Sequence, residues 1–153
     1  MIGPTPSREP RKDDYADVEA VEAMLPAERL AYWSKEFERC IRCNACRNIC
    51  PLCYCRECVA SQHDPQWIPV SNSVTGNRVF HIVRALHMAG RCTNCGECER
   101  VCPVGIPLNT LMRKMARTVQ EDFGFEAGAS SNDVAALASF GLNDPDPEQA
   151  ATP

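Results

Sequence analysis

The chain has 153 residues, eleven cysteines and a formal net charge of −4, with residues 28–118 at +6 between acidic ends. The length fits one small domain with tails, no stretch approaches the ~20 apolar residues of a membrane span, and the polar N-terminus has no apolar signal core. The odd number and close spacing of the cysteines argue against a secreted disulfide scaffold, so we expect a cytoplasmic protein.

The N-terminal segment is expected to be an extended arm followed by a helix. Residues 1–25 contain several prolines and then an acidic stretch, and a helix is predicted to begin at Pro26, a favourable residue for a first turn. Trp33 and Phe37 lie on the apolar face of this predicted helix. We interpret both aromatic side chains as core residues of a helix that leads the chain to Cys40.

Two segments share one cysteine pattern. Residues 40–51 read C-I-R-C-N-A-C-R-N-I-C-P and residues 92–103 read C-T-N-C-G-E-C-E-R-V-C-P, which is C-x2-C-x2-C-x3-C-P twice. This is the ligand run of bacterial two-cluster ferredoxins, in which three close cysteines bind one cluster and the fourth binds the other. The proline after the fourth cysteine lacks an N–H and fixes φ, which directs the chain away from the cluster. The sequence therefore predicts two [4Fe-4S] clusters.

Each predicted cluster takes three cysteines from one run and one from the other. The predicted ligands of the first cluster are Cys40, Cys43, Cys46 and Cys102. The predicted ligands of the second cluster are Cys92, Cys95, Cys98 and Cys50. Because so small a core cannot hold itself together by apolar burial alone, we expect the iron-free chain to be largely unfolded.

Three further cysteines, Cys53, Cys55 and Cys58, exceed what two clusters need. One hypothesis is a third [4Fe-4S] cluster, with its fourth ligand from His63, from another side chain or from a partner. A second is a zinc site made by the three cysteines and His63, and a third is a set of free thiols in a buried lining. Cys53 and Cys55 are too close for an unstrained disulfide and three thiols cannot all pair, so we favour a metal.

A loop and a helix are predicted between the two runs. The loop covers residues 60–76, and the helix covers residues 77–89, with Gly90 as its C-cap. His81 and His87 lie on this predicted helix, and we interpret each as a packed or surface residue rather than a metal ligand.

A further helix and a polar tail are predicted after the second run. The helix starts near Pro107, keeps a 3.6-residue apolar period and stops at Gly124. Residues 125–153 are small, polar and acidic, and we expect them to be largely extended, with disorder around Asp144. One short amphipathic turn is predicted within residues 134–140.

The basic centre of the chain is interpreted through the predicted clusters. An oxidised [4Fe-4S] cluster with four thiolates is a dianion, and nearby arginines balance its charge and favour the more negative, reduced state. Nucleic-acid binding is the alternative interpretation of this basicity, and some arginines are simply solvated surface charges. We favour compensation of the clusters and expect no nucleic-acid partner.

Three stretches carry a resemblance to a known family. They are the nineteen residues from Cys40 to Cys58, D-P-Q-W at residues 64–67 and R-A-L-H-M-A-G-R-C at residues 84–92. They resemble the dicluster iron–sulfur modules of anaerobic multi-subunit oxidoreductases: the iron–sulfur parts of formate dehydrogenase and hydrogenase β subunits, and the small electron-transfer subunit of tungsten-dependent benzoyl-coenzyme A reductases. The resemblance covers about two-thirds of the chain. It implies a non-catalytic electron relay docked to a larger catalytic subunit, and it favours a third cluster at the extra cysteines.

The sequence as a whole predicts an α+β fold. A bacterial two-[4Fe-4S] ferredoxin-like core with added helices is expected over residues 26–124, between an extended arm, 1–25, and a largely extended acidic tail, 125–153. No flavin- or F420-binding domain, G-x-G-x-x-G run or Walker loop is recognised, so one-electron transfer is expected rather than hydride chemistry. The expected partners are a larger catalytic oxidoreductase subunit and further electron-transfer subunits. A free soluble ferredoxin shuttle is the alternative, although the tails, the added helices and the basic core argue against it.

Overall fold

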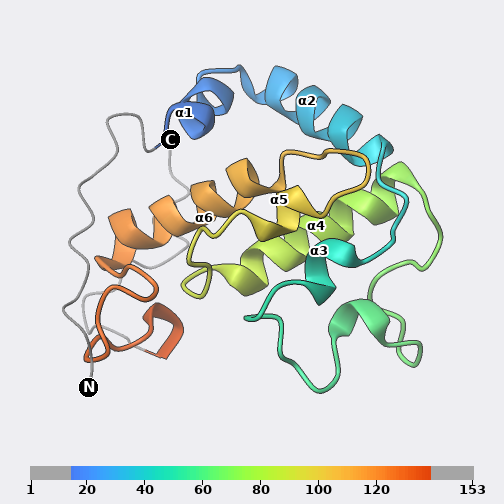
Figure 1. Ribbon diagram of the computed structural model, residues 1–153. Helices are drawn as coiled ribbons and strands as arrows, with labels where there is room; N and C mark the ends of the chain where they lie inside the picture. The colour runs from blue at the N-terminus through green and yellow to red at the C-terminus, as the bar shows by residue number, and fades with distance from the viewer. Residues whose placement is uncertain (1–14, 139–153) are drawn as a thin grey trace, which may run out of the picture.

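The computed structural model describes residues 15–138, and this part of the chain is helical (Figure 1). Its α-helices, in chain order, are α1 (Ala16–Glu22), α2 (Pro26–Glu38), α3 (Ala45–Asn48), α4 (Val74–Met88), α5 (Glu97–Arg100) and α6 (Leu108–Phe123). Two 3-10 turns, η1 (Val59–Ser61) and η2 (Ala136–Ala138), complete the elements of the described residues.

The strands of the predicted α+β core do not appear, because no residue between 15 and 138 lies in a β-strand. The segments next to the cysteine runs are helical instead, because α2 precedes the first run and α4 and α6 lie on either side of the second, and the runs themselves are irregular loops. Arg42 and Asn44 in the first run, and Asn94 and Gly96 in the second, have φ angles between 56° and 78°. This left-handed region cannot continue a strand. The described part of the chain is therefore a helical arrangement around two irregular loops, and the α+β class is not confirmed.

The central helix of the fold is α4. It packs against both α2 and α6, α1 lies on α6, and the one-turn helices α3 and α5 contact each other, with α5 also contacting α6 (Figure 1). Their buried apolar side chains form the core, whose largest members are Phe37, Phe80, Ile106, Leu108 and Met112. Burial of each such side chain contributes about 1.5–3 kcal/mol, and the packed helices hold the cysteine-bearing loops in place.

The three long helices lie close to their predicted positions. α2 begins at Pro26 as predicted, and α6 ends before Gly124, which has a φ of 62°. α4 begins at Val74, three residues before the predicted start. The reason is an N-cap: the N–H of Gly76 donates to Ser73 Oγ at 3.1 Å, which satisfies one free donor of the first turn.

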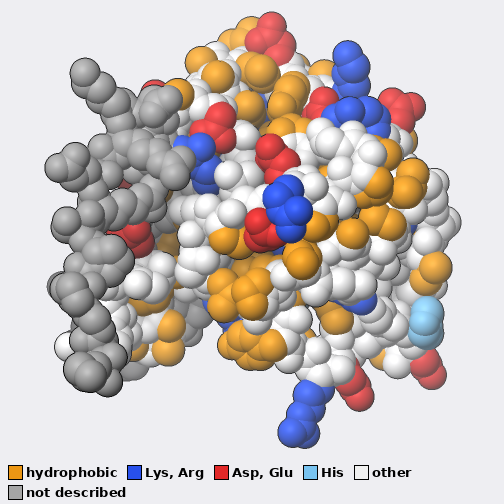
Figure 2. Space-filling view, viewed as in Figure 1, with side chains coloured by type: hydrophobic (Ala, Val, Ile, Leu, Met, Phe, Trp, Pro, Cys, Tyr) orange, Lys and Arg blue, Asp and Glu red, His pale blue; other side chains and the backbone are white. Residues whose placement is uncertain are grey.

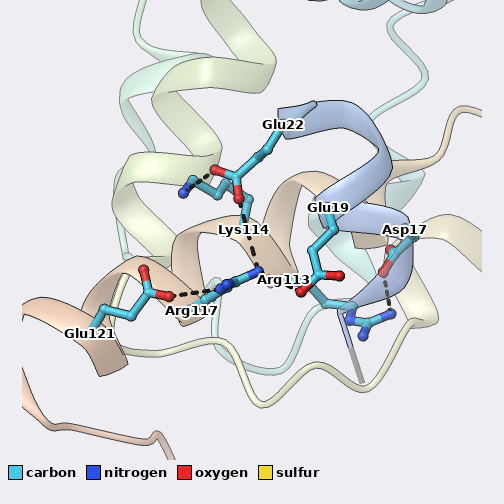
Figure 3. A network of polar contacts seen from close by, with 7 residues as sticks. All are labelled: Asp17, Glu19, Glu22, Arg113, Lys114, Arg117 and Glu121. Carbon is cyan, nitrogen blue, oxygen red and sulfur yellow. Dashed lines mark hydrogen bonds and ion pairs between the residues drawn. The ribbon is translucent and has the colours of Figure 1, made fainter. Parts of the chain in front are cut away.

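The predicted extended arm is helical where the structure describes it, because α1 occupies Ala16–Glu22. Val18 of α1 is buried. The acidic side chains of α1 face basic side chains of α6, as Figure 3 shows, and the ion pairs are Asp17 with Arg113, Glu19 with Arg117 and Glu22 with Lys114. These partners lie more than ninety positions apart in sequence, so the acidic stretch alone gave no sign of a docked helix. Residues 1–14 lie outside the described part.

The predicted tail is described only as far as residue 138. Between residues 125 and 138 the chain forms no α-helix, and η2 falls within the turn predicted for residues 134–140. Ala136 of η2 is buried, so this stretch packs on the domain. Residues 139–153, with the predicted disorder around Asp144, lie outside the described residues.

Candidate metal centres

The two cysteine runs have the same backbone conformation. Arg42 and Asn94, each two residues after the first cysteine, have φ angles of 56° and 57°. Asn44 and Gly96 follow at equivalent positions with φ angles of 59° and 78°, and the one-turn helices α3 and α5 start directly after them. The repeated sequence therefore produces a repeated geometry.

Four cysteines line a first cavity, three from the first run and one from the second: Cys40, Cys43, Cys46 and Cys102. Apolar side chains, including Phe80 and Leu108, form much of its wall. Two backbone N–H groups point at its sulfurs. The N–H of Arg42 donates to Cys40 Sγ and the N–H of Ile106 donates to Cys102 Sγ, each at 3.4 Å.

Four cysteines line a second cavity with the opposite division: Cys92, Cys95, Cys98 and Cys50. The rest of the wall includes two methionines, Met88 and Met112, and two polar side chains, those of Arg84 and Asn109. The N–H of Asn94 donates to Cys92 Sγ at 3.4 Å, as its counterpart does in the first run. Each of the two predicted ligand sets thus lines one cavity.

The donors of these cavities fit iron–sulfur clusters. All eleven cysteines are free thiols, and thiolates are the ligands that such clusters prefer. Across residues 15–138, no three His, Cys, Asp or Glu side chains converge closely enough to hold a single metal ion. A four-iron cube instead binds each thiolate at a different corner, so its ligands do not have to meet at one point.

The cysteines of each run differ in burial. Cys43 and Cys95, the second cysteine of each run, are exposed, whereas Cys46 and Cys98, the third, are buried. Burial raises the pKa of the Cys46 thiol to about 11 and also raises the pKa of Cys98. Because metal ligands must be deprotonated, these buried thiols need the positive charge of iron to become thiolates.

One side of α4 faces the first cysteine run and the residues after it. Four buried side chains lie there, at spacings of four, three and four residues: Asn77, His81, Arg84 and Met88. Asn77 Nδ2 donates to the carbonyl oxygens of Phe37 and Cys40, at 3.1 and 2.9 Å. The only signal of this role in the sequence was a polar residue on the apolar side of a predicted helix, and its partners could not be inferred from it.

His81 is a packed residue beside a predicted ligand. Its ring stacks on Phe37 with 4.7 Å between the ring centroids, and its Nε2 lies 3.3 Å from Cys40 Sγ. Burial, with the charges of Arg84 and Arg42, lowers the pKa of His81 to about 4. The imidazole is therefore neutral at pH 7, and the prediction that it packs holds.

The three extra cysteines line a third, larger cavity of about 740 Å³. Its wall also carries four arginines and one histidine: Arg47, Arg56, Arg84, Arg91 and His87. His63, the predicted candidate for a fourth ligand, is not one of the lining residues. The structure thus brings Cys53, Cys55 and Cys58 to one cavity and separates them from His63.

Residues 36–106 match the family model of the 4Fe-4S dicluster domain. The chain contains a 4Fe-4S dicluster domain. Its cofactors are two [4Fe-4S] clusters, as the repeated cysteine run predicts.

Three curated relatives of this dicluster domain are named as beta subunits. The chain is 34% identical over 104 residues to the F420-dependent formate dehydrogenase subunit beta of Methanocaldococcus jannaschii, covering 67% of this chain and 27% of that protein. It is 33% identical over 105 residues to the F420-dependent formate dehydrogenase 1 subunit beta of Methanococcus maripaludis, covering 69% and 26%. It is 25% identical over 99 residues to the sulfhydrogenase 2 subunit beta of Pyrococcus furiosus, covering 48% and 30%. The chain thus spans about a quarter of the length of the two formate dehydrogenase subunits.

The surface and the helices of the described part give two further findings. None of the helices within residues 15–138 is long and apolar enough to cross a membrane. On the face in Figure 2, acidic and basic side chains lie side by side among apolar ones, and no single basic patch dominates the part that is not grey.

Proposed function

We propose that this chain is the electron-transfer iron–sulfur subunit of an anaerobic oxidoreductase complex, relaying single electrons to or from a larger catalytic subunit. The observation that carries the proposal is the pair of cavities, each lined by three cysteines of one run and one of the other. When bound, the clusters supply one-electron transfer. The names of the relatives, which are β subunits of formate dehydrogenase and hydrogenase, support a subunit rather than a free shuttle.

In this proposal the chain holds the clusters and shields them from water. The first cluster takes the four cysteines of the first cavity and the second takes the four cysteines of the second. Phe80 and Leu108 exclude water from the first cavity, and Met88 and Met112 exclude it from the second. Backbone N–H groups, such as that of Arg42 on Cys40 Sγ, donate to sulfurs that carry negative charge in a cluster.

The proposal extends to a third metal site at Cys53, Cys55 and Cys58. Their shared cavity of about 740 Å³ supports a cluster-sized group, and the arginines in its wall suit an anionic one. His87 is in the lining, so we take it, rather than His63, as the protein's candidate for a fourth ligand. Zinc bound by three cysteines and one histidine is the alternative metal, and it would require these side chains to move together, because they do not converge on one point among residues 15–138.

The test is the metal content and spectrum of anaerobically purified full-length protein. Two clusters give about eight irons per chain and three give about twelve, each four-iron cluster adding four. About eight irons with one zinc would support the zinc alternative, whereas about eight irons with three titratable thiols would leave the extra cysteines without a metal. Fewer than about four irons, in protein that is folded and freshly reconstituted, would overturn the dicluster proposal itself.

The role as a subunit needs a separate measurement. Native mass spectrometry of untagged protein from its own host should detect a larger oxidoreductase subunit. A monomer that is reduced and reoxidised at full rate by several unrelated enzymes would instead favour the free ferredoxin shuttle.

The choice of His87 as a ligand is tested with a matched pair of variants. If His87 is a ligand, His87→Ala and His63→Ala should differ in iron content.

A further inference from the structure

Arg84 is a buried cation that the two predicted cluster sites share. Its side chain is on α4, and the residue is only 6% exposed. One guanidinium nitrogen, Nη2, donates to the carbonyl oxygen of Cys46 at 3.0 Å, and Nη1 lies 3.9 Å from Met112 Sδ. Cys46 belongs to the first ligand set, while Arg84 itself lines the cavity of the second. The same residue therefore borders both metal centres.

Arg84 differs from the surface arginines in what balances its charge. Three other arginines, Arg100, Arg113 and Arg117, form ion pairs with carboxylates. Within residues 15–138, Arg84 has no ion pair with a carboxylate, and its buried Nε has no hydrogen-bond partner. A buried charge without a counter-ion is strongly unfavourable.

The groups that face Arg84 are cysteines. Arg84 lines the second cavity together with Cys50 and Cys98, lines the third together with Cys53, and donates to the carbonyl oxygen of Cys46. These four residues come from both ligand sets and from the extra cysteines. Of the nearby polar residues, His81 is neutral, and the carboxylate of Glu97, which lines the same cavity, pairs with Arg100. The Arg42 guanidinium donates to Asn77, Pro69 and Gly76. The negative charge that balances Arg84 is therefore that of the cysteine thiolates at both metal centres.

We propose that Arg84 is a potential-setting residue, whose buried charge is shared by the two clusters and raises the reduction potential of each. The inference rests on the proposed function, because it needs both clusters in their cavities. Adding one electron makes a cluster more negative, and a fixed cation nearby favours that reduced state. Inside the protein, where the effective dielectric constant is low, this attraction is much stronger than between groups in water.

The competing interpretation gives Arg84 a purely structural role, in which the hydrogen bond to Cys46 fixes the first run. Three variants of the full-length protein separate the two. Arg84→Gln removes the charge and keeps a donor, Arg84→Lys keeps the charge and loses the planar fork, and Arg39→Gln is the control. Arg39 is next to Cys40 in sequence but exposed, so solvent and salt screen its charge.

The measurement is a redox titration of each anaerobically purified protein, followed by electron paramagnetic resonance. We expect Arg84→Gln to lower the reduction equilibrium constant of both clusters roughly tenfold, which is about 59 mV for a one-electron couple. Arg84→Lys and Arg39→Gln should keep both constants within roughly threefold of the parent protein. Unchanged midpoints in Arg84→Gln, or an equal loss in Arg84→Lys, would overturn the proposal.

A further variant guards against failure of Arg84→Gln to retain iron. Arg84→Met replaces the buried charge by an apolar side chain of similar length, a type of exchange that buried sites often tolerate. Its two midpoints should fall as in Arg84→Gln. If neither neutral variant holds iron, Arg84→Lys decides the question. Midpoint potentials near those of the parent protein would support a role for the charge, and a tenfold fall in the reduction equilibrium constants would contradict it. Iron content separates the two proposals. A parent protein without two clusters would contradict the proposed function, whereas a protein with two clusters and unchanged midpoint potentials in the neutral variants would contradict only the role of Arg84.

Discussion

The two cysteine runs share one backbone but have different surroundings. Around the first run, α4 places Asn77 on the carbonyl oxygen of Cys40 and His81 beside its sulfur. Around the second, the wall beyond the cysteines contains thioethers and an amide, those of Met88, Met112 and Asn109. The geometry of the ligands thus comes from the local motif, whereas the environment of each centre comes from helices distant in sequence. Equal ligand sets are therefore expected to differ in stability and in potential.

The largest effect is expected when both clusters are removed, after which the two cysteine runs can no longer be compared. Iron-free protein, made by chelation or iron-depleted expression, should lose its cooperative thermal unfolding transition. The reason is that eight thiols line cavities in a small core, and cluster binding supplies part of the folding free energy. Circular dichroism during heating checks this, and a cooperative transition at the temperature of the iron-loaded protein would contradict it.

The next effect tests whether the runs exchange ligands. We expect Cys50→Ser to damage the cluster of the second run and Cys102→Ser to damage that of the first, because each lines the cavity of the other run's cysteines. Electron paramagnetic resonance of the two reduced variants distinguishes the clusters. Matched variants of the exposed Cys95 and Cys43 identify which signal belongs to which run. Loss of each run's own cluster would show that ligation is not crossed.

A smaller effect should separate the supports of the two runs. Asn77→Ala removes the hydrogen bonds to two buried carbonyl groups and the contacts with Arg42 Nε and Asn72 Oδ1, so it should lower the free energy of unfolding by about 2–3 kcal/mol. Asn109→Ala is the control, because its side-chain Oδ1 has no hydrogen-bond partner in the described residues, and it should cost less than about 1 kcal/mol. Denaturant titration of the iron-loaded proteins measures both, and equal losses would argue against a special role for Asn77.

The smallest expected effect concerns a single contact of the first run. Because a cluster thiolate is an acceptor, we expect His81 Nε2 to donate to Cys40 Sγ across their 3.3 Å separation. His81→Phe keeps the stacked ring and removes this donor, and should lower the reduction equilibrium constant of the first cluster by roughly threefold. The second cluster should not change. A redox titration that moves both clusters equally would leave the contact without an electrostatic role.

The sequence predicted the parts of this molecule that depend on neighbouring residues. The cysteine spacing indicated both ligand sets, and the apolar period with Pro26 and Gly124 placed α2 and α6. α1 was missed because its stability comes from α6: Val18 is buried and Asp17 pairs with Arg113, and neither fact can be read from residues 1–25 alone. The strands of the predicted α+β fold were not found in residues 15–138, where the segments next to both runs are the helices α2, α4 and α6.

The parts of the site that were missed come from long-range contacts. His81 and Arg84 appear in the sequence as ordinary members of a helix, and only its packing brings them to Cys40 and Cys46. His63 was chosen as a ligand candidate because it is five residues from Cys58, whereas the cavity instead places His87, much further along the chain, beside the extra cysteines. Proximity in sequence is a weak guide where a loop and a helix meet.

The exposure of Cys43 and Cys95 is expected to make both centres sensitive to dioxygen. Each centre has one corner that faces solvent, and oxidation of thiolates follows their accessibility. Dioxygen should therefore attack at these two corners first, and the buried ligands should outlast them. A docked subunit that covers both corners would protect the iron while it shortens the path of the electron, so in the cell this chain is expected to persist mainly in its assembled form.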